Sequence, residues 1–381
     1  MIYLDNNATT RIAPEVFEVM KPFLGEFYGN PSSAYNFGRE TRRAIEDSRE
    51  KIAELLGANQ SNEIVFTSGG TESDNWAILG TLEASPNKKH IVTTCVEHEA
   101  VRNLCDKLES KGFEITRLEV SEAGFLNLNE LKNSLRDDTA IVSVMLANNE
   151  TGILFPVEEI ARIVKADSDA IFHVDGVNAV GKIAVDLKNT AIDLLAISGH
   201  KFHAPKGIGA LYIKDGIRLP ALSIGGGQEK GRRAGTEAVH QIAALGAAAE
   251  LAADFSAMEK VLYLRNKLEN EILQKIPNSR LNGTNDANFR LPNTSNISFS
   301  NTNGEAILAK LNDAGICVST GSACSAETHT ASAVLQAMDV PYADAMGAIR
   351  FSLGRYNTET EVDFVLETLP KIIAELREMF A

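Results

Sequence analysis

Short apolar runs rich in β-branched residues alternate with longer amphipathic stretches along most of the chain. The run Ala140–Leu146 has no regular alternation of apolar and polar residues, which is typical of a strand that helices cover on both faces. Arg39–Leu56 is predicted to be a helix that ends at Gly57, and Thr71–Ala84 a helix that follows its strand directly. The pattern therefore predicts an α/β fold with a large, mainly parallel, doubly wound sheet. Its strands are expected at Glu63–Thr67, His90–Cys95, Thr139–Leu146, Ala170–Val174, Ile192–Ile197 and Gly209–Ile213.

The pattern changes after a loop rich in Gly and Arg at Gln228–Gly235. Long helices near Thr236–Ile276 are followed by alternating strands and helices and by a final helix near Glu359–Phe380. A chain of 381 residues has room for two domains. We therefore predict a large domain over residues 13–257 and a smaller α+β carboxyl-terminal domain over residues 258–381. The amino-terminal segment 1–12 is expected to pack near the small domain.

The composition excludes several classes of protein. Apolar residues make up 44% and charged residues 23% of the chain, as in folded globular proteins. Lys plus Arg number 37 and Asp plus Glu 51, so the formal net charge of −14 would repel a phosphate backbone or an anionic membrane. No run approaches the roughly 20 apolar residues of a membrane span, and Met1–Asp5 does not resemble a signal peptide. We expect no nucleic-acid partner, no membrane association and a cytoplasmic location.

Polar residues follow directly after five of the predicted strands. Ligands of an open α/β sheet gather beyond the carboxyl ends of its strands, so these residues are expected to form one site. In chain order they are Ser68–Glu72, Glu97–His98, Asn148–Glu150, Asp175–Asn178 and Ser198–Lys201.

The turn Gly69-Gly70-Thr71 lies between a strand and a helix. Glycine lets backbone N–H groups approach an anion, and a helix N-terminus carries about half a positive charge. The turn therefore suits a phosphate, to which Ser198 and His200 could add donors. The alternative is a tight turn in which Thr71 caps the helix.

Lys201 and Asp175 each follow or end a buried strand. Burial lowers the pKa of a lysine, and such an amine can form a Schiff base. A buried carboxylate at Asp175 needs a cationic partner, which a protonated pyridine nitrogen would supply. Taken alone, Lys201 could be a surface lysine, and Lys206 is a second candidate for the Schiff base. Asp175 alone could cap a helix. Together with the phosphate turn, the two residues match the requirements of pyridoxal phosphate.

Two further side chains suit a substrate and proton transfer. His98 could lie flat against a cofactor ring and move protons near neutral pH, or it could simply cap a helix. Arg350, in the strand-like run Ile349–Ser352, could bind a substrate carboxylate in a bidentate manner. Arg355 is more simply a solvated charge.

Four cysteines are too few for a disulfide framework in a chain of this length, so we expect reduced thiols. Cys324 lies in Ser319–Ala326, a run of small residues that suggests a loop, and it is a candidate nucleophile. The other three, Cys95, Cys105 and Cys317, are expected to be buried core residues. Neither the cysteines nor the histidines show metal-ligand spacing, so no resident metal is predicted.

Motifs that span nearly the whole chain add a family resemblance. They are Tyr3–Thr10, Gly29–Ser33, Thr67–Ser73, Asn148–Gly152, Ser198–Lys201, Pro205–Gly209, Arg233–Thr236, Gly321–Cys324 and Ile349–Ser352. With these motifs the chain resembles the cysteine desulfurases of the NifS/IscS group, which are pyridoxal-phosphate enzymes of aminotransferase class V. The sequence Gly-Ser-Ala-Cys in a long loop separates this group from the branch that includes selenocysteine lyases.

The resemblance implies the fold of type I pyridoxal-phosphate enzymes and assigns roles. Lys201 would carry the cofactor, Asp175 would pair with its pyridine nitrogen, and His98 would stack on the ring. Arg350 and Asn149 would bind the substrate, L-cysteine. The full cofactor-binding set would be Gly70, Thr71, His98, Asn149, Asp175, Asn178, Ser198, Gly199, His200, Lys201 and Thr236, the last from the other subunit of a homodimer.

The resemblance also implies the reaction. Cys324 would take the sulfur of L-cysteine as a persulfide, L-alanine would leave, and an iron–sulfur scaffold protein would accept the sulfur for cluster assembly. Cys324 would contact an iron–sulfur cluster only transiently. The alternatives are a selenocysteine lyase, another class V aminotransferase, or a catalytically silent assembly platform. One departure is visible: Asn178 stands where the family usually has glutamine, so its bond to the cofactor would be longer or bridged by water.

Overall fold

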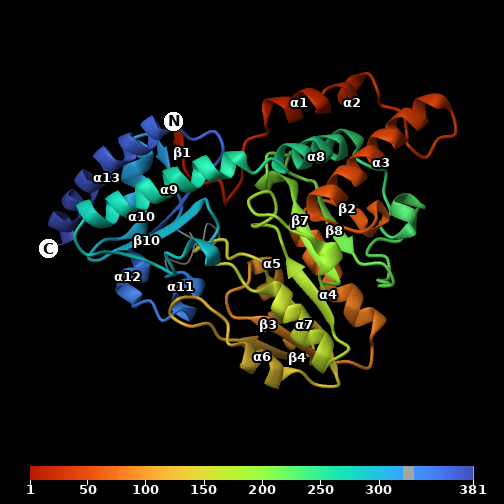
Figure 1. Ribbon diagram of the computed structural model, residues 1–381, viewed down its shortest axis with the longest axis horizontal. Helices are drawn as coiled ribbons and strands as arrows, with labels where there is room; N and C mark the ends of the chain where they lie inside the picture. The colour runs from red at the N-terminus through yellow and green to blue at the C-terminus, as the bar shows by residue number, and fades with distance from the viewer. Residues whose placement is uncertain (321–329, 381) are drawn as a thin grey trace.

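The computed structural model describes residues 1–320 and 330–380 (Figure 1). A seven-stranded sheet forms the centre of its larger part. The strands are β2 (Ile64–Thr67), β3 (His90–Thr94), β4 (Glu114–Leu118), β5 (Thr139–Met145), β6 (Ile171–Asp175), β7 (Leu194–Ser198) and β8 (Gly209–Ile213), in the order β2-β8-β7-β6-β5-β3-β4. Neighbours pair in parallel except at β8, which is antiparallel to both β2 and β7. The predicted mainly parallel sheet is confirmed, and β4 is a strand that the apolar pattern missed because it lies at the edge and is partly exposed.

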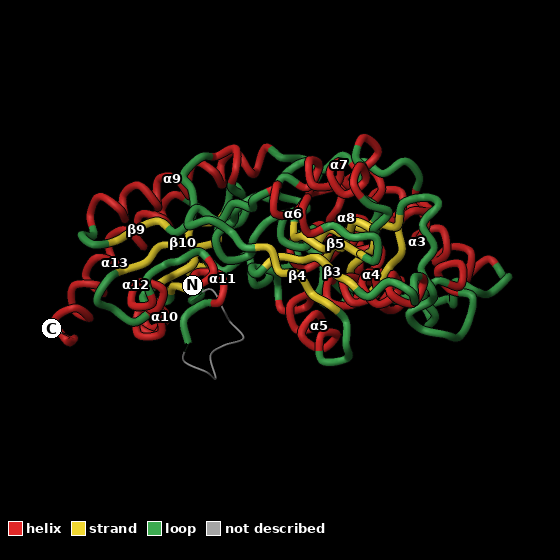
Figure 2. Tube along the Cα trace, turned by 90° about the horizontal axis from the view of Figure 1, so that it is seen from below, coloured by secondary structure: helices red, strands yellow, loops and turns green. Residues whose placement is uncertain are grey.

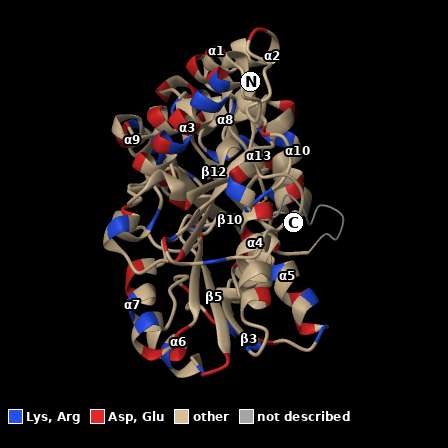
Figure 3. Cartoon of the chain, turned by 90° about the vertical axis from the view of Figure 1, so that its right-hand side faces the viewer, with Lys and Arg blue, Asp and Glu red and all other residues tan. Residues whose placement is uncertain are grey.

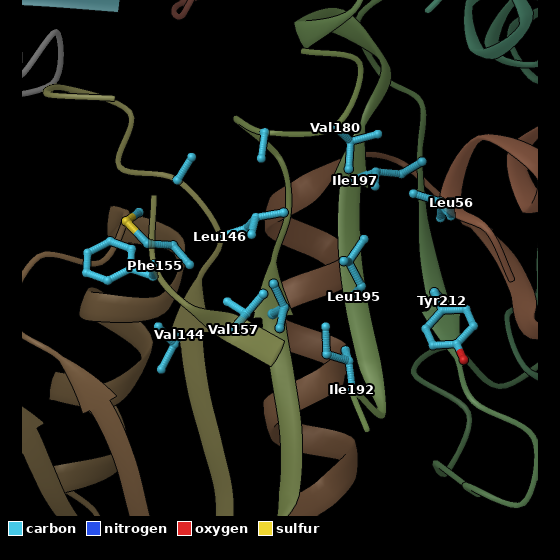
Figure 4. Close-up of a cluster of buried hydrophobic side chains, with 14 of the residues drawn as sticks. Leu56, Val144, Leu146, Phe155, Val157, Val180, Ile192, Leu195, Ile197 and Tyr212 are labelled. Atoms are coloured by element: carbon cyan, nitrogen blue, oxygen red, sulfur yellow. The ribbon is translucent and has the colours of Figure 1, made fainter. Parts of the chain in front are cut away.

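Helices cover both faces of this sheet. Figure 2 shows α6 (Leu128–Ser134), α7 (Val157–Asp167) and α8 (Val239–Ala252) on one side, and α4 (Gly70–Ala84) and α5 (Glu99–Glu109) on the other. The long helix α3 (Asn36–Leu56) packs against α8 and ends at Gly57, whose φ of 58° is the left-handed conformation that favours glycine. The short helices α1 (Pro14–Met20) and α2 (Pro22–Gly25) precede it. Figure 4 shows part of the apolar core between the sheet and its helices.

A second sheet, β12-β10-β9, forms the centre of the smaller part. Its antiparallel strands are β9 (Ser279–Leu281), β10 (Thr294–Phe299) and β12 (Ala348–Ser352). The helices here are α9 (Ser256–Lys275), α10 (Gly304–Asp313), α11 (Ala333–Ala337), α12 (Tyr342–Met346) and α13 (Glu359–Phe380). The two-residue strands β1 (Ile2–Tyr3) and β11 (Ile316–Cys317) pair beside them.

The apolar cores do not divide at a single position in the chain. Leu4 joins the second core, which otherwise contains residues between Val261 and Leu376. Val334 and Leu335, however, pack into the core of the large sheet. The division of the domains between residues 257 and 258 therefore stays a prediction.

Strand direction brings the predicted site residues to one edge of the large sheet. Since β8 is antiparallel to both of its neighbours, β2 runs parallel to β7, and Thr67 and Ser198 both pair with Gly209. The carboxyl ends of β2, β3, β5, β6 and β7 consequently point the same way.

The amino-terminal segment runs along this edge. Asn6 N donates to Ser352 O in β12 at 3.0 Å, and Thr10 N donates to His200 O at 2.8 Å. The segment therefore connects the second sheet to the strand ends of the first.

Charged side chains lie mainly on the outer helices. Figure 3 shows acidic and basic residues mixed on these helices, whereas the central strands carry few. Within residues 1–320 and 330–380, no helix has the length and apolar character needed to cross a membrane.

Candidate active site

A cavity of about 270 Å³ lies at the carboxyl ends of the large sheet. It brings together most of the residues that the sequence predicted for the site. The predicted residues that line it are Gly70, Thr71, His98, Asn149, Asp175, Asn178, Ser198, His200 and Lys201. The cavity is also lined by five residues to which the sequence assigned no role, Ala8, Asp74, Met145, Ala147 and Val177.

One end of the cavity suits an anion. Helix α4 begins at Gly70, and no side chain in the described part of the protein caps this end. Gly69 occupies the cap position with a φ of 152°, and a Cβ atom built on it would lie 3.5 Å from Ser198 Oγ. A hydroxyl and the uncapped N–H groups of a helix therefore converge here. The alternative in which Thr71 caps the helix is wrong, because Thr71 lies in the first turn.

The other end carries a buried carboxylate. Asp175 ends β6 and is 4% exposed, and its Oδ1 accepts a hydrogen bond from Val177 N at 2.9 Å. Burial raises the pKa of Asp175, while the nearby His98 and Lys201 act to lower it. A cation placed in the cavity beside Asp175 would stabilise the ionised form.

Asp74 and Glu97 are two further buried carboxyl groups near Asp175. Burial raises the pKa of Glu97 to about 8, and burial together with the charges of Asp175 and Glu97 raises the pKa of Asp74 well above its ordinary value. Asp74 Oδ1 also lies 3.4 Å from His173 Nε2. Asp74 was not predicted from the sequence, although its position four residues after Gly70 on the same helix face could have indicated it.

Lys201 lines the same cavity. Its Nζ donates to Asn7 O at 2.5 Å and to Ala8 O at 3.2 Å. Burial, and secondarily the charge of Arg350, lowers the pKa of Lys201 to about 8. Lys206 is exposed and does not line the cavity, so the structure distinguishes the two lysines.

His98 combines the two interpretations that the sequence left open. Its Nδ1 accepts a hydrogen bond from Ala100 N at 3.1 Å and so caps helix α5. The same residue is exposed and lines the cavity, and the protein around its imidazole removes part of the water and so lowers its pKa. The capping bond leaves Nε2 as the ring nitrogen that can exchange a proton with a ligand.

Arg350 does not line the cavity, but it contacts Asn149, which does. It is 3% exposed, and its guanidinium donates to Asp5 Oδ1 at 2.7 Å and to Asn149 O at 3.0 Å. Its Nε has no hydrogen-bond partner within residues 1–320 and 330–380. Arg355 is not the simple solvated charge that we expected, because it is half-buried and donates to Leu251 O at 3.3 Å.

The amino-terminal segment forms one wall of the site through Ala8, a role that the sequence pattern did not predict. Beyond the carbonyl groups that hold Lys201, Thr9 Oγ1 lies 3.2 Å from His200 Nδ1. Asn7 Nδ2 donates to Asn149 O at 3.1 Å and to Thr294 Oγ1 at 2.9 Å. The paired polar residues near the start of the chain could have indicated this role.

Of the predicted residues that the structure describes, Gly199, Thr236 and Arg350 do not line the cavity. Gly199 packs under it, and its N–H already donates to Ile208 O at 3.0 Å. Thr236 is exposed. Cys324 lies outside the described residues, and of the other cysteines Cys105 is buried while Cys95 and Cys317 are half-buried.

Comparisons with known proteins identify the class that this fold and site define. A family model described as aminotransferase class V matches residues 2–365. The chain belongs to this family, as the sequence predicted.

Its relatives narrow the class further. A cysteine desulfurase of Trichormus azollae is 54% identical over 381 residues, covering 100% of this chain and 94% of the relative. The cysteine desulfurase NifS of Azotobacter vinelandii is 50% identical over 380 residues, covering 99% and 94%. A solved structure described as a NifS-like protein has a TM-score of 0.92 and 39% identity, covering 98% of this chain and 100% of that one. Within the family the chain thus falls among the cysteine desulfurases.

Proposed function

We propose that the protein is a pyridoxal-phosphate-dependent cysteine desulfurase that converts L-cysteine to L-alanine and holds the sulfur as a persulfide on Cys324. The observation that carries the proposal is that one cavity is lined by the uncapped helix start at Gly70, by the buried carboxylate of Asp175 and by Lys201, whose pKa is lowered to about 8. These three groups match the phosphate, pyridine nitrogen and aldehyde of the cofactor.

The residues of the cavity would hold the cofactor as follows. Gly70, Thr71, Ser198 and His200 would bind the phosphate, and Asp175 would accept a bond from the pyridine nitrogen. Asn149 and Asn178 would face the ring oxygen. Bound there, pyridoxal phosphate would act as an electron sink for the α-carbon of L-cysteine and so stabilise the charge left on the adjacent β-carbon when the bond from that carbon to sulfur breaks.

The chain itself would bind the substrate and move its protons. With a pKa of about 8, about one tenth of Lys201 is deprotonated at pH 7, and this neutral amine can attack a carbonyl carbon. His98 would stack on the cofactor ring and exchange a proton through Nε2. Arg350, whose Nε is unpartnered, would bind the substrate carboxylate.

Cys324 would act as the sulfur acceptor. Its thiolate would form an S–S bond to the sulfur of L-cysteine while the C–S bond breaks, and the carbon would keep the electron pair and take up a proton, giving L-alanine. The persulfide would then pass to an iron–sulfur scaffold protein. The cytoplasmic location stays a prediction of the sequence.

We further infer that the active site is completed in a homodimer. Thr236 follows a loop held by two ion pairs, Arg49 with Glu229 at 2.7 Å and Arg233 with Glu72 at 2.9 Å. A loop anchored in this way can present the exposed Thr236 hydroxyl to the phosphate site of a partner.

The test is to add L-cysteine to the purified protein and to measure L-alanine and sulfide with and without a reductant. We expect equimolar alanine and sulfide only when a reductant releases the persulfide. Cys324→Ala should still bind the cofactor and L-cysteine but form no persulfide, whereas the matched control Cys105→Ala should form it normally. Turnover of selenocysteine alone, or transamination without sulfide, would contradict the proposal and favour the corresponding alternative.

A further inference from the structure

Lys182 is a buried lysine to which the proposed chemistry gives no role. It lies in the turn region after β6 and is 6% exposed. Its Nζ lies 2.8 Å from Asn178 O, 2.8 Å from Asn178 Oδ1 and 3.0 Å from Asn7 Oδ1. Three oxygen atoms around Nζ match the three N–H donors of an ammonium. Burial, and secondarily the charges of Lys201 and Arg350, lower the pKa of Lys182, whereas the three oxygen atoms favour its charged form. Each of these oxygen atoms belongs to a neutral group. The bonds to Oδ1 of Asn178 and of Asn7 fix the orientation of the two side-chain amides.

The amide of Asn178 is oriented by this contact. Lys182 Nζ donates to Asn178 Oδ1, so the acceptor atom of the amide faces the lysine. Nδ2 therefore points to the other side, where it donates to Asn148 O at 3.3 Å. Asn178 lines the cavity, so the second N–H of Nδ2 is available to a ligand there.

Asn7 is oriented in the same way. Its Oδ1 accepts from Lys182 and from Asn293 Nδ2, at 2.9 Å, and its Nδ2 donates to Asn149 O. Its main-chain oxygen accepts the hydrogen bond from Lys201. Lys182 thus contacts two residues that adjoin the cofactor site, although it lies outside the cavity itself.

We propose that Lys182 is a positioning residue that locks the Asn178 amide, so that it offers a donor rather than an acceptor to the bound cofactor. The inference rests on the proposed function, because the ring oxygen of pyridoxal phosphate is the acceptor that this donor would meet. If the amide turned over, its oxygen would face the ring oxygen, and two acceptors would oppose each other.

The test compares Lys182→Met in two backgrounds, the wild type and Asn178→Ala. Two properties are measured: the dissociation constant of pyridoxal phosphate and the pH at which the visible absorbance of the bound cofactor changes. In the wild-type background we expect cofactor binding to weaken about fivefold, the value of one hydrogen bond, and the absorbance midpoint to move to higher pH. In the Asn178→Ala background the same substitution should change the affinity less than about twofold, because no amide is left to orient.

A control variant and a contrary outcome distinguish a positioning role of Lys182 from an effect of its positive charge. Lys214→Met removes a lysine that also donates to a main-chain oxygen, Thr190 O at 3.0 Å, but lies away from the cavity, and it should change neither property. Equal effects of Lys182→Met in both backgrounds would overturn the inference, because loss of a positive charge alone would then explain them.

A second variant covers the case in which Lys182→Met does not fold. Asn178→Asp keeps two oxygen atoms for Lys182 but has no N–H for the cavity, so it should reproduce the loss of cofactor affinity. Wild-type affinity and absorbance in Asn178→Asp would overturn the inference. A wild-type protein that binds no pyridoxal phosphate would instead refute the proposed function, and this inference with it.

Discussion

The lowered pKa of Lys201 predicts how fast the protein without cofactor reacts with pyridoxal phosphate at each pH. Only the neutral amine attacks the aldehyde, so the rate should follow the deprotonated fraction of Lys201. Burial lowers the pKa of Lys201 from 10.5 to about 8, and the charge of Arg350 contributes. At pH 7 the deprotonated fraction is then about 10%, against roughly 0.03% for an ordinary lysine, a difference of about 300-fold.

The assay mixes cofactor-free protein with pyridoxal phosphate between pH 6 and pH 10 and follows the visible absorbance. The half-maximal rate should fall near pH 8. Lys201→Ala serves as the blank, since it retains the phosphate site but lacks the amine, and the exposed Lys206 gives the matched control Lys206→Ala. Borohydride reduction followed by peptide mapping should place the adduct on Lys201.

Two results would refute this reasoning. A half-maximal rate near pH 10 would mean that burial does not lower the pKa of Lys201. An adduct mapped to Lys206 would mean that the wrong lysine was assigned, whatever the pH dependence.

Three further predictions follow from the site and its surroundings. Arg350→Ala should raise the KM for L-cysteine about 10- to 100-fold, the value of a buried charge-assisted pair, and Arg355→Ala less than about fivefold; equal effects would remove the carboxylate role from Arg350. Mixing Lys201→Ala with Thr236→Ala protein should restore normal cofactor affinity in half of the sites of the heterodimers, and affinity that stays at the Thr236→Ala value despite proven subunit exchange would exclude a shared site. Burial raises the pKa of Glu97 from 4.5 to about 8, so its contribution to stability is fully present below about pH 4.5 and is lost as the pH rises through about 8. Glu97→Gln should therefore flatten the fall in the free energy of unfolding across this range by up to a few kcal/mol, as measured by urea denaturation, and an unchanged pH profile would contradict the raised pKa.

The sequence by itself determined six of the seven strands of the large sheet and the residues that follow them. Apolar runs covered on both faces predict a mainly parallel sheet, and a parallel sheet gathers the residues after its strands at one edge. Gly70, Asp175 and Lys201 could therefore be assigned to a common site before their distances were known. Local signals also sufficed for the helix that ends at Gly57, because only the residues of one turn decide such an end.

Long-range partners could not be predicted in this way. Asp5 pairs with Arg350 and the carbonyl of Asn7 holds Lys201, and in both cases nearly 200 residues or more separate the partners. Asp74 joined the site only because its helix packs against the strand that ends at Asp175. No local pattern encodes such contacts.

The ionisation of the site was likewise decided by the tertiary structure. The sequence could suggest that a lysine at a strand end has a lowered pKa, but not that Lys201 would reach a pKa of about 8, nor that Lys182 would be held by neutral oxygen atoms alone. A pKa depends on how much water is removed from a group and on which charges and dipoles surround it. Both are set by the packing of segments that are distant in the chain, so they exist only once the chain has folded.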